Sequence, residues 1–400
     1  MGVIDRSDER LLTPSFVKLC LTSLLFWGSV IGLNPVLAPF VKDELGGSTI
    51  AVGIVASSVG VAAIFSRRWI GPIGDRHGRR PLLIGGALLA SLGILGTLLV
   101  SSVPLMMPTR FLLGVGQAAF MVGLTTSAMD LVSPLRRGEA MSLVLMFVHF
   151  GGASGPLLMS WLRNAYSYDA VWIAAACGAA AAALVASKLR LPAHAPVAPP
   201  PPGERTRVIH PLGVWPGIVF ALGQIGVIGF LAYAALYAKE VGLGKPALVF
   251  AVSSLVVALM RLFGSRLPDT LGTARAGTLA LAFMMGGLGL AAAWQTPVGL
   301  LVSTAVISCG TALTFPTFVT AAVDVAAENE RSVVVSTFTM FGDVSGALGG
   351  FVFGAMVALA NYPAAFLTYA ASAALATFLL HTQLVPSMAR ARHSDSSIAI

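Results

Sequence analysis

The chain has 400 residues, of which 56% are hydrophobic and only 10% are charged, and its formal net charge is +8. Soluble globular domains carry about 25% charged residues, so this composition excludes an ordinary soluble protein and predicts one that crosses a membrane repeatedly. The basic balance implies no nucleic-acid partner, because membrane proteins concentrate Lys and Arg on their cytoplasmic side.

Long apolar runs follow one another along the whole chain. A membrane-spanning helix needs about 20 predominantly apolar residues, whereas a β-barrel would show short alternating segments instead. We therefore predict an all-α membrane protein with twelve transmembrane helices. The spans fall near 16–41, 49–66, 81–102, 105–129, 138–162, 170–190, 213–238, 246–264, 274–294, 297–322, 332–359 and 363–384.

A dense charge cluster separates the second span from the third. The stretch 67–80 reads RRWIGPIGDRHGRR and holds five arginines and one aspartate. Such a cluster cannot lie in hydrocarbon, so we predict a tight aqueous turn, which Gly71 and Gly78 would permit.

The basic residues also predict the orientation. With the N-terminus inside, the cytoplasmic segments hold 20 Lys and Arg, and the opposite loops hold four. This bias predicts that both termini are cytoplasmic.

The longest connection, 191–212, contains a proline run that cannot form a helix. We interpret it as a cytoplasmic linker between a six-helix half, 1–190, and a second six-helix half, 213–385. The remaining residues, 386–400, are predicted to be a disordered cytoplasmic tail.

The two halves are repeats. At a constant offset of 194 residues, rare charged residues and glycines fall on one another: Arg67 on Arg261, Asp75 on Asp269, Gly78 on Gly272, Gly116 on Gly310, Asp130 on Asp324 and Arg137 on Arg331. Paired six-helix repeats are a known architecture of secondary transporters, with the substrate site between the repeats at mid-membrane.

Three motifs carry a resemblance to a known family. They are Gly71-x-x-x-Asp75-Arg76-x-Gly78-Arg79-Arg80 after the second span, Arg110-Phe-Leu-Leu-Gly114-Val-Gly116-Gln117 in the fourth, and Gly151-Gly152-Ala-Ser-Gly155-Pro156 in the fifth. With these motifs the chain resembles the major facilitator superfamily over essentially its whole length. The third motif resembles the helix-kink motif of the 12-helix drug:proton antiporter branch, although Met159-Ser160 replaces its trailing glycine pair.

The resemblance implies a cytoplasmic gate built on the first motif. Asp75 is expected at the N-terminus of span eleven, near Arg331, where the helix dipole favours an anion. By the repeat, Asp269 should serve span five in the same way, and Asp130 should pair with one of the arginines. The alternative for Arg76, Arg79 and Arg80 is that they only anchor the chain at the cytoplasmic side.

Three ionisable residues lie at membrane depth, where such groups are costly and usually functional: Arg110, His149 and Asp343. His149 and Asp343 are related by the repeat. A carboxyl group in an apolar cavity resists ionisation and a histidine titrates near neutral pH, so either could carry a coupling proton. The alternatives are a histidine bonded to a backbone carbonyl, and an Asp343 that pairs with Arg110 or His149. The resemblance ties Arg110 to proton coupling, with Asn34 as its expected partner.

The remaining candidates for a substrate cavity are few and mostly apolar, which favours an amphiphilic substrate. Each of them could instead serve helix packing or lipid contact. They are Asn34, Gln117, Met121, Phe147, Gln224, Tyr233, Tyr237, Thr311, Phe315 and Phe341.

The chain shows no nucleotide-binding loop, and its three cysteines lack metal-type spacing. We therefore expect no enzyme activity, no metal and no cofactor, with the proton gradient as energy source. The predicted function is proton-coupled export of small amphiphilic drugs or metabolites by alternating access, performed by a monomer in the bacterial plasma membrane. The partners are then the lipid bilayer, the proton and a small-molecule substrate. The alternatives are a transporter of a specific polar solute, such as a sugar or amino acid, and a transporter-like sensor that moves nothing.

Overall fold

The computed structural model describes residues 12–133, 136–191, 209–264, 267–324, 326 and 330–390. For residues 71, 75, 268, 269, 331 and 332 only the backbone belongs to the described part. Within these ranges the chain forms helices and short connections and contains no strand. The predicted all-α fold class is confirmed.

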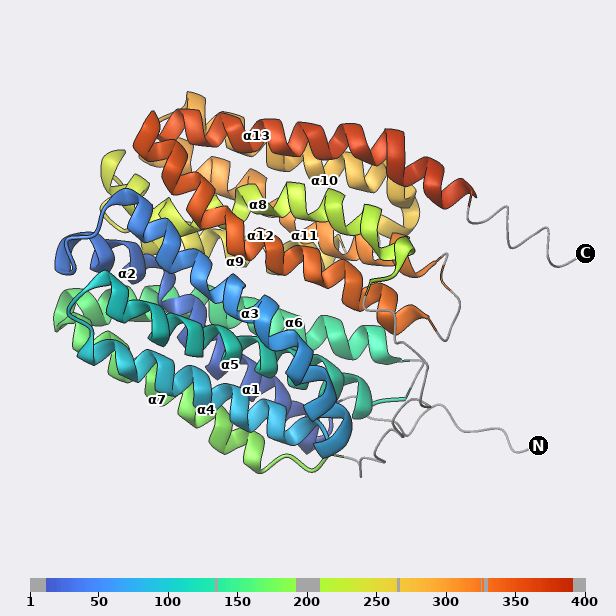
Figure 1. Cartoon of the computed structure of the whole chain (residues 1–400), viewed down its shortest axis with the longest axis horizontal. Helices are drawn as coiled ribbons and strands as arrows, with labels where there is room; N and C mark the ends of the chain where they lie inside the picture. Colours follow the sequence, from blue (N-terminus) through green and yellow to red (C-terminus); the bar gives the residue numbers. More distant parts are fainter. Residues whose placement is uncertain are drawn as a thin grey trace, which may run out of the picture. The chain divides into compact units, whose positions relative to one another are not determined.

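The helices follow one another with short connections (Figure 1). Their bounds are α1 (Pro14–Gly32), α2 (Asn34–Pro39), η1 (Phe40–Glu44), α3 (Thr49–His77), α4 (Arg79–Gly96), η2 (Thr97–Leu99), α5 (Val103–Asp130), α6 (Arg137–Ala165), α7 (Tyr168–Ser187), α8 (Pro211–Glu240), α9 (Ala247–Phe263), α10 (Leu267–Ala293), α11 (Pro297–Val323), α12 (Arg331–Leu359), α13 (Tyr362–Leu379) and η4 (Leu380–Leu384).

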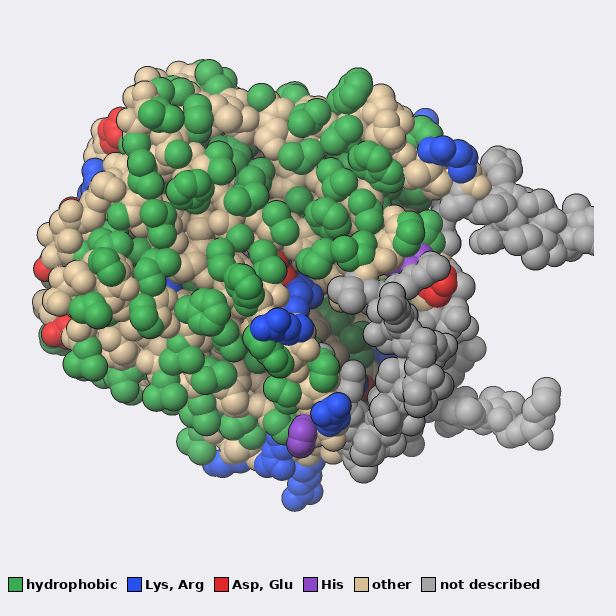
Figure 2. Space-filling view, viewed as in Figure 1, with side chains coloured by type: hydrophobic (Ala, Val, Ile, Leu, Met, Phe, Trp, Pro, Cys, Tyr) green, Lys and Arg blue, Asp and Glu red, His purple; other side chains and the backbone are tan. Residues whose placement is uncertain are grey.

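Eleven helices in the described ranges are long and apolar enough to cross a membrane, when α1 is counted together with α2 and η1. The one remaining predicted span, 246–264, corresponds to α9, a shorter apolar helix of 17 residues. Figure 2 shows hydrophobic side chains over most of the helix surface in view, with few charged side chains among them. This surface suits contact with lipid tails.

The charge cluster at 67–80 is not the loop that the sequence predicts. α3 continues as a helix to His77, and the chain reverses only at Gly78, which has a φ of 81°. Only glycine adopts this conformation without strain. The helix can extend because long arginine side chains lie along an apolar helix while their charged ends reach water; Arg68, for example, stacks over the ring of Trp69.

The first span is broken rather than gently kinked. α1 ends at Gly32, and a second helical segment begins at Asn34, next to Pro35. Elsewhere prolines do not interrupt the helices, since α5, α6 and α11 continue through Pro108, Pro156 and Pro316.

Contacts group the chain into two compact units. Unit 1 comprises Met1–Leu33, Phe65–Val100 and Leu105–Pro199, and unit 2 comprises Asn34–Ile64, Ser101–Pro104 and Pro200–Ile400. Unit 2 thus includes the first part of α3, so these bounds differ from the halves 1–190 and 213–385, whose division stays a prediction. The linker residues 192–208 lie outside the described ranges.

Within unit 1, α1 packs against α6 and α7, and α4 lies beside α7 (Figure 1). Phe26 of α1 stacks on Phe120 of α5, with ring centroids 3.7 Å apart. Within unit 2, α8 packs against α12, and α10 packs against both α11 and α13.

The 194-residue repeat extends to the way helices pack. A side-chain carbon on Gly116 of α5 would lie 2.5 Å from the backbone nitrogen of Ala90 in α4. In unit 2, a carbon on Gly310 of α11 would lie 3.1 Å from the backbone nitrogen of Met284 in α10. Both partners are shifted by 194, so the two units build the same close helix pair from equivalent residues.

The end of the chain also differs from the prediction. After η4 the helix continues to Arg390, so residues 386–390 are helical rather than disordered. Residues 391–400 lie outside the described ranges.

Candidate functional site

The centre of unit 2 is a helix pair in which two backbones come very close. α12 carries glycines at 346, 350 and 354, a spacing of four that places them on one face. Small residues at this spacing let membrane helices approach until their backbones touch. The facing residues are Gly53 and Gly60 of α3.

The contacts between α3 and α12 are specific. A side-chain carbon on Gly53 would lie 2.9 Å from the carbonyl carbon of Gly350, and one on Gly60 would lie 2.9 Å from Cα of Ala347. The hydroxyl of Ser57 accepts a hydrogen bond from the backbone N–H of Phe351 at 2.9 Å. No larger side chain fits at these glycines without a shift of one helix.

Two further contacts join the same parts of unit 2. The hydroxyl of Tyr233 in α8 donates to the carbonyl oxygen of Thr49 at 2.5 Å. At the helix ends, Lys239 Nζ lies 2.9 Å from Asp43 Oδ2, and both side chains are 46% exposed. Segments of the first sequence repeat are thereby held to the second repeat. The four-residue glycine spacing in α12 indicates a close helix approach, but it does not identify Gly53 and Gly60 as the partners.

Asp343 lies at the edge of this close contact. It is half-buried in α12, one turn before the small-residue face that meets Gly60. It is the twelfth residue after Arg331, the first residue of α12. At 1.5 Å per residue this is about 18 Å along the helix, a depth near the middle of a bilayer about 30 Å thick.

His149 occupies the equivalent place in unit 1. It is half-buried in α6, twelve residues after Arg137, the first residue of that helix. The neighbouring Gly151 packs on α1, because a side-chain carbon there would lie 2.6 Å from the backbone nitrogen of Gly28. Gly151 and Gly155 thus serve close helix packing. α6 continues as a helix through Pro156, and the predicted kink stays a prediction.

Arg110 is the most deeply buried charged group of unit 1. Its residue is 8% exposed, and its Nε has no hydrogen-bond partner. The acids of unit 1 whose side chains are described, Asp130, Glu139 and Asp169, lie at the last residue of α5 or in the first turns of α6 and α7. Asn34 falls in unit 2, so its predicted pairing with Arg110 stays a prediction.

The gate motif is described in part. Arg79 Nε lies 3.4 Å from Asp130 Oδ2, so Asp130 does pair with one of the arginines as predicted. Arg79 also donates to the carbonyl oxygen of Gly74 at 3.2 Å. Arg80 donates to the carbonyl oxygen of Ser187, and Arg76 is exposed. These contacts tie α3, α4, α5 and α7 together at one end of unit 1.

The predicted gating positions Gly71, Asp75 and Asp269, and the expected partner Arg331, have side chains outside the described part. The gating role of this motif therefore stays a prediction.

Two predicted cavity residues are packing residues instead. Tyr233 and Tyr237 are 0% and 1% exposed. The hydroxyl of Tyr237 donates to the carbonyl oxygen of Ala291 at 3.1 Å, and both rings pack on aromatic neighbours such as Phe353 and Phe366. A buried tyrosine needs one acceptor for its hydroxyl, and here backbone carbonyls provide it, so neither ring lines an open cavity.

The other predicted cavity residues remain candidates. Phe315 is 37% exposed, and Gln224 has a buried Oε1 that no hydrogen bond satisfies. Thr311 donates to the carbonyl oxygen of Ile307 at 3.0 Å. The half-buried members of the set are Asn34, Gln117, Met121, Phe147, Gln224, Thr311 and Phe341.

Comparison with known proteins identifies the family. The model of the Major Facilitator Superfamily matches residues 19–350 and 247–396. The chain belongs to the major facilitator superfamily. An uncharacterised MFS-type transporter of Salmonella typhimurium is 27% identical over 369 residues, covering 88% of this chain and 92% of the relative. A relative from Burkholderia mallei is 29% identical over 392 residues, with coverages of 92% and 91%.

Solved structures share the fold. A POT family transporter in complex with a thioalcohol-conjugated peptide has a TM-score of 0.80 at 14% identity, covering 93% of this chain and 96% of its own. A nucleoside transporter has a TM-score of 0.76 at 15% identity, with coverages of 91% and 98%. The protein is therefore a multi-pass membrane transporter of a superfamily whose members are in general not enzymes. No group of three or more metal-ligating side chains lies within the described ranges.

Proposed function

We propose that this transporter couples proton movement to the export of small amphiphilic molecules. The observation that carries the proposal is the equivalent placement of His149 and Asp343, each half-buried twelve residues into a repeat-related helix. Titratable groups at this depth are costly and rare unless they serve a function. Proton uptake at one of them would change the charge beside a helix contact.

The helix contact beside Asp343 suits alternating access. It consists of backbone and small side chains of α3 and α12, with one side-chain hydrogen bond at Ser57. Such a surface can separate without pulling large interlocked side chains apart, and it can form again with little side-chain ordering. A charge change at Asp343, one turn away, would alter the free energy of that contact.

The substrate class follows from the side chains that are left. Of the eight remaining cavity candidates, four have aromatic or thioether side chains, namely Phe147, Phe315, Phe341 and Met121. The polar ones include Gln224, whose buried Oε1 no hydrogen bond satisfies. An adaptable apolar lining suits compounds of varied shape.

Transport assays test the proposal directly. Expression in bacteria that lack their own pumps should lower the accumulation of several amphiphilic dyes, and an uncoupler should abolish the difference. Asp343→Asn should remove the pH dependence of transport while dye binding persists. Asp169→Asn, in the first turn of α7, is the matched control and should transport as the wild type does. Raised dye accumulation in the expressing cells would refute export.

A second candidate function is uptake of a specific polar solute. The solved structures with the same fold include transporters of peptides and nucleosides, and the unsatisfied Gln224 Oε1 offers one buried hydrogen-bond acceptor. Thermal unfolding of the purified protein with a panel of dipeptides, nucleosides, sugars and amphiphilic dyes distinguishes the two. Stabilisation by one polar solute alone would favour uptake of that solute.

The location follows from the same proposal. Relatives of the chain come from the bacteria Salmonella and Burkholderia, and the excess of Lys and Arg predicts cytoplasmic termini in a bacterial plasma membrane. A reporter protein that is active only in the cytoplasm should be active when fused to either terminus. A reporter that is active only outside the cytoplasm should be inactive at both. We also propose a monomer. The protein mass in each detergent complex, measured by sedimentation and corrected for bound detergent, should then be that of one chain, 41.2 kDa.

A further inference from the structure

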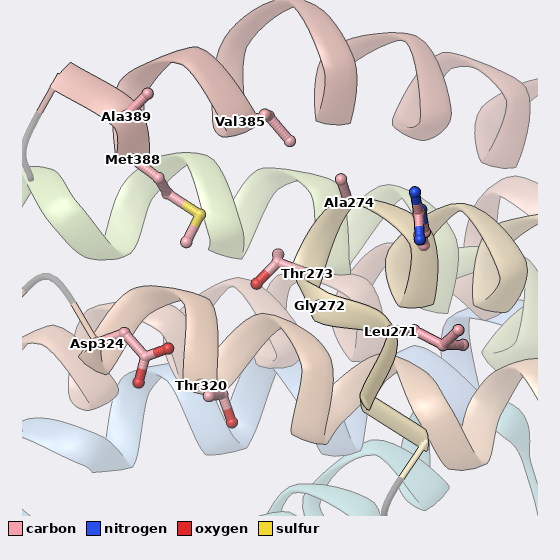
Figure 3. Close-up of a pocket in the computed structure, with 10 residues that line it drawn as sticks. Leu271, Gly272, Thr273, Ala274, Thr320, Asp324, Val385, Met388 and Ala389 are labelled. Carbon is pink, nitrogen blue, oxygen red and sulfur yellow. The ribbon is translucent and has the colours of Figure 1, made fainter. Parts of the chain in front are cut away.

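A pocket of about 620 Å³ opens at the end of unit 2 where α11 ends (Figure 3). Its walls come from the start of α10, the last turn of α11 and the last helical turns of the described chain. The lining residues are Leu271, Gly272, Thr273, Ala274, Arg275, Thr320, Asp324, Val385, Met388 and Ala389. This volume lies within the range of about 300–1,000 Å³ that is typical of small-molecule sites.

The equivalent place in unit 1 is occupied by an arginine. There Arg79, the first residue of α4, pairs with Asp130, the last residue of α5. Shifted by 194 residues, Asp130 becomes Asp324, whereas Arg79 becomes Thr273. Unit 2 therefore keeps the carboxylate, whereas the position equivalent to Arg79 carries a threonine instead of a guanidinium group.

The backbone shows that the two places are equivalent. Gly78 and Gly272 precede Arg79 and Thr273, and both have positive φ, 81° and 72°. In each unit a helical segment starts directly after this glycine. Its first turn lies beside the C-terminal end of the following helix, α5 in unit 1 and α11 in unit 2. The change from Arg79 to Thr273 is thus a side-chain difference on a repeated backbone.

Asp324 gives one side of the pocket a negative charge. Asp324 is the C-cap residue of α11, where the last carbonyl groups add partial negative charge to that of the carboxylate. Asp324 is exposed and makes no ion pair with any residue of the described ranges. Figure 3 shows its carboxylate on one side of the pocket, with Thr320 on the same helix and Met388 opposite. Arg275, the other charged lining residue, is exposed.

We infer that this pocket binds an organic cation whose guanidinium or ammonium group pairs with Asp324 and whose apolar body lies against Val385 and Met388. The cation takes the place that Arg79 has in unit 1. The pocket lies at the helix ends, whereas Asp343 lies in the middle of α12. It is a second site, separate from the groups that carry the proposed transport function.

The test uses butylguanidinium and its uncharged isostere N-butylurea on the purified full-length protein. Butylguanidinium should raise the unfolding temperature saturably, and N-butylurea should not. Asp324→Asn should weaken binding about tenfold or more, because it removes a charge-assisted hydrogen bond. Thr273→Arg should rebuild the ion pair of unit 1, raise the unfolding temperature by itself and abolish the response to butylguanidinium.

A reciprocal variant completes the design. Arg79→Thr removes the guanidinium group of unit 1, so this variant should bind a second equivalent of butylguanidinium in titration calorimetry. Equal responses to butylguanidinium and N-butylurea would overturn the inference. So would an unchanged response in Thr273→Arg, which keeps Asp324 and therefore does not depend on how the Asn variant folds.

Discussion

Substitution of Gly60 by alanine should open the contact between α3 and α12. The new methyl carbon would overlap the backbone nitrogen of Ala347 and the carbonyl carbon of Gly346, and it would lie 2.9 Å from Cα of Ala347. Because carbon atoms in contact stand about 3.5–4.0 Å apart, the helices must separate by about 1 Å or more at this level. The atoms that meet are backbone atoms, which cannot move aside by changing rotamer.

The expected size follows from the cost of overpacking. Inserting a carbon into a well-packed contact costs about 1–3 kcal/mol, which corresponds to a shift of roughly 5- to 150-fold between two conformations. If α3 and α12 separate during transport, Gly60→Ala should raise the fraction of molecules in which they are apart. Transport should slow, because the closed state must form once in each cycle.

Spin labels at Lys42 and Glu240 can measure this change, since they flank the ion pair between Asp43 and Lys239. The wild type should give one short distance, and Gly60→Ala should add a longer one. Gly286→Ala is the matched control, because a side-chain carbon at that helical glycine meets nothing within 4 Å. An unchanged distance distribution in Gly60→Ala, at wild-type stability, would refute the proposed opening.

Three further predictions concern charged groups. Asp343→Asn should flatten the dependence of transport rate on pH, measured in proteoliposomes; an unaltered profile would move the proton site elsewhere. Reversing the charge of Lys239 or of Asp43 alone should weaken the interaction between these two residues by up to about 1 kcal/mol, a small effect because both side chains are half-exposed. The double reversal should restore the distance distribution, and high salt should reduce all these differences. Arg110→Met should raise the unfolding temperature while abolishing transport, because it removes a buried charge whose Nε makes no hydrogen bond; a lower unfolding temperature would show that Arg110 has a stabilising partner.

Hydropathy and rare charged residues were enough to predict the fold. Apolar runs of span length can only be helices in lipid, because every backbone group must bond within its own segment. The repeat was visible because matched residues such as Asp130 and Asp324 are scarce in a chain with 17 acids. Its glycines are far less informative one by one, since the chain contains 43 of them. The contact of Gly60 with α12 could therefore not be singled out from sequence.

The errors have physical causes as well. Arg67 and Arg68 looked like loop residues, yet a helix can carry such charges beyond the hydrocarbon when the side chains extend along its surface. Tyr233 looked like a polar cavity residue, yet a hydroxyl needs only one carbonyl, and Thr49 supplies it. Sequence indicates that a polar group lies at membrane depth, but only the packing decides whether a backbone atom or a ligand satisfies it.

The two repeats share a close helix contact but differ in some of their charged residues. Gly116 and Gly310 make the same close contact with equivalent partners, so neither helix pair can change its spacing without cost. At other equivalent positions the chemistry differs: Arg110 corresponds to Thr304, which is buried and donates to its own helix at 2.7 Å. The close helix contact is thus present in both repeats, whereas the buried arginine of α5 has no counterpart at the equivalent position of α11. Because a buried charge costs free energy unless it is paired or functional, its presence at this position in one repeat alone leads us to predict that Arg110 serves transport rather than folding.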